Sequence, residues 1–266
     1  MTDKVRFVGD PVACVIAKTP DAAKDAAEVV SIDIDILPAT TLATEAAKPG
    51  APVLFDNVAG NVALDFQFGD PDTVDKAFQT AHHISRVDIR NNRIVVASME
   101  PRSALAHYNN ETDCFTMRLG CQGTFGMRNQ LAGILNMERE KVRVLTENVG
   151  GSFGMKSFVY PEYICLLHAA KKLSRPVKWT EERSSSFLSD QQGRDHEVKG
   201  ELALNNLPNA KIIRASIIGV TEQFRSKGLM DWYANTLADS TVNGYSNHYW
   251  NGITTLAWCE ICHGLI

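Results

Sequence analysis

The sequence lacks the features that mark nucleic-acid-binding, membrane-spanning or exported proteins. It has 27 Lys and Arg against 31 Asp and Glu, a formal net charge of −4, and no basic stripe that would support nucleic-acid binding. No apolar run approaches the length of a membrane span. The first residues lack the charged-then-apolar pattern of a signal peptide. We therefore expect a cytoplasmic protein with no nucleic-acid partner and no membrane association.

Cysteine is scarce and dispersed, with six residues in 266. Scattered cysteines without a secretion signal are typical of reduced thiols. Cys259, Cys262 and His263 have the CxxCH spacing of covalent haem c attachment. Little chain follows them to enclose a haem, and a lone CxxC lacks the second ligand pair of a zinc site. A small haem c protein is therefore the least favoured hypothesis for the function of this chain. No residue is assigned as a metal ligand.

Three common catalytic motifs are also absent. The sequence has no Gly-Xaa-Ser-Xaa-Gly nucleophile elbow, no P-loop and no Gly-Xaa-Gly-Xaa-Xaa-Gly dinucleotide fingerprint. Ser152 follows two glycines, but the sequence indicates no base to activate it. No catalytic residue is assigned on these grounds.

The most distinctive stretch that is present is glycine-rich and spans residues 148–156. Gly150, Gly151 and Gly154 fall within five residues, between a strand-like run at 141–146 and a predicted helix at 161–173. Such a loop exposes backbone N–H groups, which hold anionic or electron-rich ligands. Phe153 could anchor a core or form the wall of a cofactor pocket. A glycine-rich turn without any ligand fits the spacing equally well.

A second candidate is Gln122, which lies between a predicted strand at 114–119 and a predicted helix at 124–135. Polar side chains at such junctions commonly reach a ligand, and an amide can donate a hydrogen bond to an oxo group. Glu100 and Arg102 lie between two predicted strands, where a mutual salt bridge is the simplest interpretation.

The remaining pattern predicts an α+β chain. Strands at 12–17 and 31–36 flank a helix at 21–30, and Asp70 and Pro71 begin another helix. Further strands are expected at 84–89, 93–97, 104–108 and 175–179, and residues 196–204 and 211–220 suit a hairpin. Residues 37–69 are typical of a surface linker. Beyond residue 220 no sustained period remains, which argues against a well-defined fold there.

Several of these stretches together resemble the molybdenum-cofactor subunits of the xanthine dehydrogenase, aldehyde oxidase and carbon monoxide dehydrogenase family. They occur in the family's order and cover about residues 5 to 220: residues 5–13, 99–102, Gln122 with its following helix, 149–156, 175–179, Glu182 and Arg183. The likeness is greatest to the carbon monoxide dehydrogenase large-subunit branch.

The resemblance implies a domain organisation. Residues 1–45 correspond to the C-terminal part of an α/β hammerhead domain, 46–69 to a linker, and 70–220 to a first molybdopterin-binding domain of mixed sheets and helices. Residues 221–266 match nothing in the family, and a shifted reading frame near residue 220 is one hypothesis for this divergent tail.

The resemblance also implies a site and a cofactor. The family's metal-facing loop maps onto Gly151, Ser152, Phe153 and Gly154, and its glutamine near the apical oxo ligand maps onto Gln122. The implied cofactor is molybdenum-molybdopterin, in the cytosine dinucleotide form for a bacterial protein. Iron–sulfur and FAD subunits, a small-molecule substrate and oligomer formation are the implied partners.

Two departures from the family limit the expected activity. Purine-oxidising members carry a glutamate directly after the loop lysine, where this chain has Ser157, so purine hydroxylation is not expected. The family's catalytic glutamate lies in a region that this sequence does not contain. We therefore expect a fragment with little or no turnover alone, and a non-catalytic interaction module without metal is the second hypothesis.

Overall fold

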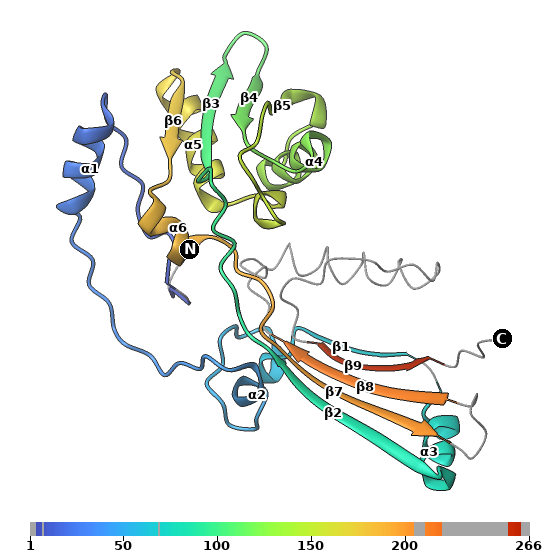
Figure 1. Ribbon diagram of the computed structural model, residues 1–266. Coiled ribbons are helices and arrows are strands. Elements are labelled where there is room, and N and C mark those ends of the chain that lie inside the picture. The colour runs from blue at the N-terminus through green and yellow to red at the C-terminus, as the bar shows by residue number, and fades with distance from the viewer. Residues whose placement is uncertain (1–3, 7, 69, 205–210, 220–254, 262–266) are drawn as a thin grey trace. The chain divides into compact units, whose positions relative to one another are not determined.

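The computed structural model describes residues 4–6, 8–68, 70–204, 211–219 and 255–261 (Figure 1). The chain forms two compact units, and each unit is built from two separate stretches. The first unit combines residues 1–35 with 95–191, and the second combines 36–94 with 192–266. The domain boundaries predicted at residues 45, 69 and 220 come from the family resemblance, whereas these two units are defined by contacts within the fold. The predicted boundaries stay a prediction.

The first unit is a helix-on-sheet arrangement. Its four-stranded sheet has the order β5-β4-β3-β6. Strands β3 and β4 are antiparallel, β3 and β6 are antiparallel, and β4 and β5 are parallel. Helix α5 packs against β3, and α4 packs against β5. The elements are α1 (Pro20–Glu28), β3 (Ser103–Asn109), β4 (Cys114–Leu119), α4 (Thr124–Leu135), η2 (Arg139–Lys141), β5 (Val142–Leu145), η3 (Met155–Ser157), α5 (Pro161–Leu173), β6 (Val177–Thr180) and α6 (Arg183–Ser189).

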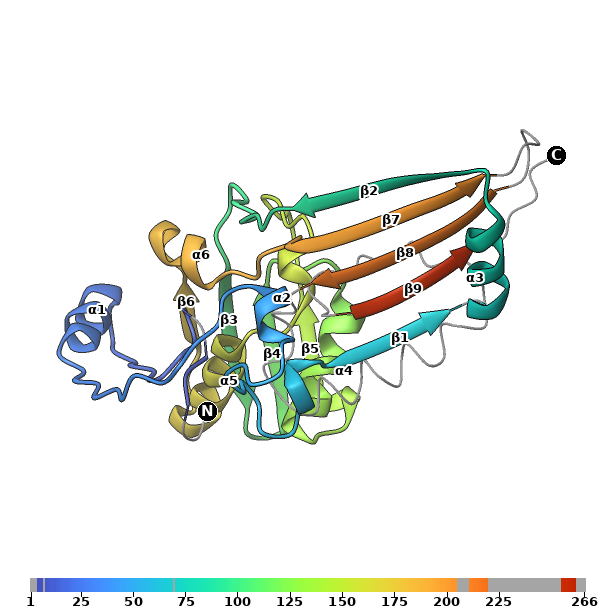
Figure 2. The same cartoon turned by 90° about the horizontal axis from the view of Figure 1, so that it is seen from below.

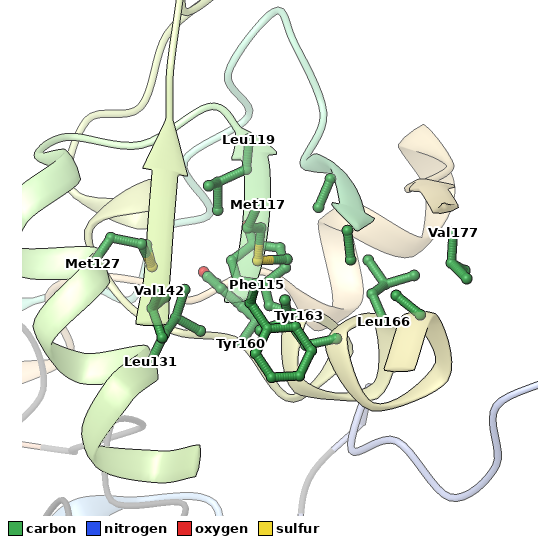
Figure 3. Close-up of a cluster of buried hydrophobic side chains, with 14 of the residues drawn as sticks. Phe115, Met117, Leu119, Met127, Leu131, Val142, Tyr160, Tyr163, Leu166 and Val177 are labelled. Atoms are coloured by element: carbon green, nitrogen blue, oxygen red, sulfur yellow. The ribbon is translucent and has the colours of Figure 1, made fainter. Parts of the chain in front are cut away.

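One face of this sheet carries the core (Figure 3). Side chains alternate along a strand, so β3 and β4 each bury every second residue and leave the others more exposed. The helices add Met127 and Leu131 from α4, and Tyr163 and Leu167 from α5. The best buried strand residues of this cluster are Ala104, Ala106, Tyr108, Phe115, Met117 and Leu119.

The helix ends follow local rules that the sequence makes visible. Pro161 occupies the first turn of α5, where its missing N–H costs nothing. Lys171 and Lys172 lie in the last turn, where positive charge suits the helix dipole. The prediction of helices at 124–135 and 161–173 is confirmed residue for residue.

The second unit is built on a five-stranded sheet (Figure 2). Its order is β1-β9-β8-β7-β2, with β1 and β9 parallel and the other neighbours antiparallel. Helix α3 packs against β8, and its N-cap Asp70 accepts hydrogen bonds from the backbone of Asp72 and Thr73. The elements are α2 (Ala43–Ala46), η1 (Ala59–Asn61), β1 (Leu64–Phe68), α3 (Pro71–Thr80), β2 (His83–Asn91), β7 (His196–Leu204), β8 (Lys211–Gly219) and β9 (Thr255–Ile261).

The predicted hairpin of β7 and β8 is confirmed, because His196 pairs with Gly219 and Leu204 pairs with Lys211. Its connecting residues lie outside the described part of the chain. Two strands occur where none was expected: β1 lies in the predicted linker, and β9 lies beyond residue 220.

Three predicted strands are wrong. Residues 12–17 and 31–36 form no strand. Strand propensity alone does not make a sheet, and no described strand pairs with these residues, so Ile32 and Ile34 remain exposed. Residues 93–97 contribute a single bridge, from Ile94 to Gly193. The mixed helix and sheet class is confirmed, whereas the hammerhead interpretation of the first 45 residues stays a prediction.

No helix among the described residues is long and apolar enough to cross a membrane.

The core of the first unit gives a stability test within one helix. Leu131 of α4 is buried and Ile134 is 55% exposed. We expect Leu131→Ala to lower the free energy of unfolding by about 2–5 kcal/mol, because it removes buried methyl groups and leaves a cavity. Ile134→Ala should change it by roughly 0.5 kcal/mol. Urea unfolding measures both, and equal losses would contradict the assigned core.

Candidate functional site

The predicted glycine-rich loop takes a backbone path that requires its glycines. Gly151 and Gly154 have φ angles of 100° and 99°, in the left-handed region that suits glycine. A side chain at Gly150 would meet the Cβ of Glu100 at 2.5 Å. Phe153 also has a positive φ, 51°, and its side chain is 77% exposed. The ring of Phe153 lies back over Gly151, where an added Cβ would be 3.0 Å from a ring carbon.

The side-chain oxygen of Gln122 accepts hydrogen bonds from three residues in and next to this loop. It accepts hydrogen bonds from the Ser152 hydroxyl at 2.7 Å, from the Gly154 N–H at 2.9 Å and from the Ser157 hydroxyl at 2.6 Å. The Gln122 backbone N–H donates to the carbonyl of Lys156 at 3.3 Å. The structure therefore brings together all five residues that the sequence predicted as cofactor-binding: Gln122, Gly151, Ser152, Phe153 and Gly154.

An ion pair between the buried Lys156 and the partly exposed Glu100 supports the loop. The Lys156 side chain is 1% exposed, and its Nζ donates to the Glu100 carboxylate at 2.7 Å and to the Glu100 carbonyl at 2.9 Å. The same carboxylate accepts from the Gly150 N–H at 2.8 Å. Partial burial alone would raise the pKa of Glu100, but the bonds from Lys156 and Gly150 outweigh it and hold that pKa below its usual value. One carboxylate thus fixes both ends of the loop.

Arg102 does not pair with Glu100, so the salt bridge expected between them is wrong. Pro101 separates the two residues, and their side chains bond to different elements. The guanidinium of Arg102 is completely buried and contacts Glu181 at 2.6 Å, Asp190 at 2.5 Å and Glu162 at 3.1 Å. It also lies over the ring of Tyr160, 3.7 Å from the ring centroid.

This cluster holds more negative than positive charge, because three carboxylates surround one guanidinium. Burial, helped by the nearby charge of Glu181 and opposed by Arg102, raises the pKa of Asp190 to about 6. The cluster anchors the segment before β3 that carries Glu100, and so it is a second layer of support for the loop.

Several hydrogen-bond donors of the site stay available. Among the described residues, none accepts a hydrogen bond from the backbone N–H groups of Gly151, Ser152 and Phe153. The exposed Gln122 amide nitrogen likewise has no partner within that part of the chain, because only its oxygen is bonded. Consecutive free N–H groups form a concavity that suits an anionic or electron-rich group. The donor set therefore fits an oxo- and sulfur-rich cofactor, and this agrees with the predicted role of the loop.

Sequence reasoning missed three members of this arrangement. Lys156 was noted only as a residue of the loop, Glu100 was given the wrong partner, and Ser157 was considered only for its lack of charge. The sequence contains no local signal for the first two, because Glu100 and Lys156 are 56 residues apart.

No group of three or more His, Cys, Asp or Glu residues that could hold a metal ion occurs in the described part of the chain. Cys259 lies in β9, and Cys262 and His263 of the CxxCH motif fall outside the described residues.

The Glu100–Lys156 pair is open to a double-mutant cycle. Glu100→Gln leaves the buried ammonium of Lys156 without its counter-charge, so we expect it to lower the free energy of unfolding by about 1–3 kcal/mol. The Lys156→Met variant and the double variant Glu100→Gln/Lys156→Met complete the cycle. The double variant should lose about 1 kcal/mol less unfolding free energy than the two single variants lose in sum. Hydrogen exchange should also quicken at Gly150.

The exposed Arg118–Glu147 pair provides the matched control for that cycle. Both of its side chains are at least half exposed, so Glu147→Gln should change stability by less than about 1 kcal/mol. Additive losses for Glu100 and Lys156 would contradict the support assigned to them.

The raised pKa of Asp190 gives a prediction for pH dependence. The folded state binds a proton near pH 6, whereas an unfolded aspartate does so near pH 3.9. Lowering the pH from 7 to 5 should therefore stabilise the fold through this group by about 1 kcal/mol. Asp190→Asn should lack that gain.

Burial lowers the pKa of His196, so this residue makes the fold more stable at higher pH and opposes the effect of Asp190. Both the unmodified chain and the Asp190→Asn variant contain His196, so its contribution cancels when their stabilities are compared. Chemical unfolding at pH 7, 6 and 5 measures the difference. Equal pH slopes in both proteins would show that Asp190 is not the group concerned.

The chain is similar to known proteins in its sequence and in its fold. Residues 54–224 match the family model of the molybdopterin cofactor-binding domain. The chain is 36% identical over 204 residues to the 6-hydroxypseudooxynicotine dehydrogenase complex subunit gamma of Paenarthrobacter nicotinovorans, covering 76% of this chain and 25% of that protein. It is 30% identical over 223 residues to the carbon monoxide dehydrogenase large chain of Hydrogenophaga pseudoflava, covering 79% and 28%.

Solved structures show the same fold. The reconstituted CO dehydrogenase from Oligotropha carboxidovorans superposes with a TM-score of 0.70 at 24% identity, over 77% of this chain and 27% of that one. The quinoline 2-oxidoreductase from Pseudomonas putida 86 superposes with a TM-score of 0.67 at 25% identity, over 77% and 26%. The chain spans about a quarter of the length of these relatives. The resemblance inferred from the ordered motifs is confirmed, and the chain belongs to the molybdopterin cofactor-binding domain family.

Proposed function

We propose that this chain is the part of a molybdenum hydroxylase large subunit that holds one side of the molybdenum-molybdopterin cofactor. The observation that carries the proposal is a set of neighbouring donors without acceptors among the described residues: the N–H groups of Gly151, Ser152 and Phe153, and the amide nitrogen of Gln122. The three N–H groups lie on a loop that the ion pair of the buried Lys156 with Glu100 fixes in place, and the Gln122 oxygen is hydrogen-bonded to that loop. The family match over residues 54–224 agrees with this assignment.

The cofactor, when bound, supplies the oxidation of a C–H bond or of carbon monoxide, with water as the source of oxygen. The chain supplies position and polarity. The loop N–H groups would hold electron-rich atoms of the cofactor, and the Gln122 amide would donate a hydrogen bond to an oxo group. The exposed ring of Phe153 would form an apolar wall beside them and exclude water.

The substrate class proposed for the intact protein comprises aldehydes, N-heterocycles and carbon monoxide. The names of the similar proteins include nicotine, quinoline and carbon monoxide as substrates. Purine hydroxylation is not proposed, because Ser157 stands where purine-oxidising members carry a glutamate, and its hydroxyl is used to bond Gln122. Little or no turnover is proposed for this chain alone, because the family's catalytic glutamate is not in its sequence.

The finer assignments remain proposals as well. They comprise the hammerhead origin of residues 1–45, the linker at 46–69, the first molybdopterin-binding domain at 70–220 and the divergent tail at 221–266. The cytosine dinucleotide form of the cofactor, iron–sulfur and FAD subunits as partners, and a cytoplasmic location belong to the same proposal. The names of the relatives, a complex subunit and a large chain, describe parts of larger assemblies.

Cofactor content tests the proposal directly. The chain should be produced in a host that makes molybdopterin, and the purified protein should contain both molybdenum and pterin, measured by metal analysis and by fluorescence after oxidative release of the pterin. Gln122→Ala should lower the pterin content several-fold, because it removes the shared acceptor of Ser152, Gly154 and Ser157. A dye-reduction assay should show no turnover.

Asn129→Ala is the matched control, because Asn129 carries an exposed side-chain amide on α4, the helix that follows Gln122. It should leave the pterin content unchanged. A folded protein without molybdenum or pterin would overturn the proposal and favour a non-catalytic interaction module.

A further inference from the structure

The side-chain amide of Gln122 has one end bound and one end open. Its oxygen accepts hydrogen bonds from the Ser152 hydroxyl at 2.7 Å, the Ser157 hydroxyl at 2.6 Å and the Gly154 N–H at 2.9 Å. Its nitrogen meets no acceptor in the part of the chain that the structure describes. An amide oxygen has two lone pairs, so three donors leave it no capacity for a ligand. Only the nitrogen of this side chain is therefore available to a ligand.

The Gly154 N–H decides which way the Gln122 amide faces. A backbone N–H can only donate, so an amide turned over would place its own NH₂ group against that N–H, with no acceptor between them. The serine hydroxyls alone would allow either orientation, because a hydroxyl both donates and accepts. The Ser152 hydroxyl is restricted further, since its oxygen already accepts the Lys156 N–H at 3.0 Å. The oxygen of Gln122 therefore faces the loop, and the nitrogen faces away from these donors.

Both serines are more enclosed than the glutamine that they hold. Gln122 is exposed, whereas Ser152 is 7% exposed and Ser157 is half-buried. A long exposed side chain samples several rotamers unless other groups hold it. Ser152 connects Gln122 to the buried Lys156, because its hydroxyl accepts from the Lys156 N–H and donates to the amide oxygen. The position of the buried segment is thus passed on to an exposed side chain.

We propose that Ser152 and Ser157 are positioning residues that fix the Gln122 amide with its nitrogen outward. The outward end offers two N–H donors and no acceptor. This side chain consequently favours a ligand atom that carries no proton, such as an oxo, sulfido or carbonyl group, over a group that has to donate a hydrogen bond. The role toward the cofactor rests on the proposed function, whereas the orientation of the amide belongs to the chain itself and needs no cofactor.

NMR of the full chain, purified without cofactor, tests the orientation. A scalar coupling across the hydrogen bond, from the Gly154 amide nitrogen to the Gln122 side-chain carbonyl carbon, should be present. Ser157→Ala should speed hydrogen exchange of the Gly154 N–H about fivefold, the factor that corresponds to one net hydrogen bond. Ser157→Thr keeps a hydroxyl and should retain the original rate. Ser184→Ala removes an exposed hydroxyl on α6 and should not change it.

Gln122→Glu tests the outward donor separately from the bonds to the loop. Its carboxylate keeps one oxygen for the three donors of the loop, but its outward atom is an acceptor. Produced in a host that makes molybdopterin, this variant should keep the unfolding midpoint of the unmodified chain and contain several-fold less molybdenum and pterin. Asn129→Asp is the matched control, because it makes the same change from amide to carboxylate at an exposed position of α4. It should retain the cofactor.

The outcomes distinguish this inference from the proposed function. An unmodified chain that contains neither molybdenum nor pterin would overturn the proposed function, while the coupling and the exchange rates, measured without cofactor, would still decide the orientation. Absence of the coupling, or an unchanged Gly154 exchange rate in both Ser152→Ala and Ser157→Ala, would overturn the positioning role. Full cofactor content in Gln122→Glu, beside a loaded unmodified chain, would overturn the donor role of the outward nitrogen.

Discussion

The arrangement of the site depends on one buried ammonium group. Lys156 is enclosed by protein, and a charge in that position is tolerated only when it is paired and hydrogen-bonded. Glu100 meets both requirements, with its carboxylate and its backbone carbonyl. The same carboxylate accepts a hydrogen bond from the N–H of Gly150. The pairing that the buried lysine requires therefore also fixes the position of the first glycine of the loop. The glycines then supply the backbone freedom that this path demands.

This support reaches further through the chain. Glu100 precedes β3, and Arg102, the residue directly before β3, forms ion pairs with Glu181, Asp190 and Glu162. Replacing such a buried cluster by apolar residues would often be neutral for stability, since burying charge is costly. Its value here is geometric, because a guanidinium that contacts three carboxylates from different elements is held in one orientation. The loop is thus positioned by charge pairs, whereas the sheet behind it is held by apolar packing.

The helices and strands within residues 103–180 could be predicted well from sequence because their signals are local. Alternation along residues 114–119 and helical periodicity at 124–135 and 161–173 are properties of the segments themselves. Residues 12–17 and 31–36 show where this fails, because a strand exists only with a partner, and the partner is not encoded in the segment. The five residues predicted to bind the cofactor were identified from glycine spacing and family resemblance. Their supports, Lys156 and Glu100, are 56 residues apart in sequence, and no local pattern links them.

The bridge between Ile94 and Gly193 has a consequence for how the chain could be rebuilt. Each of its residues donates a backbone hydrogen bond to the other at 3.0 Å, immediately outside the long stretch of the first unit, residues 95–191. The chain therefore leaves the second unit and returns to it at positions that are hydrogen-bonded to each other. Segments whose ends meet are the ones that tolerate transplantation and circular permutation. The segment 95–191, with its glycine-rich loop, could therefore be exchanged while β2 and β7 on either side keep their pairing.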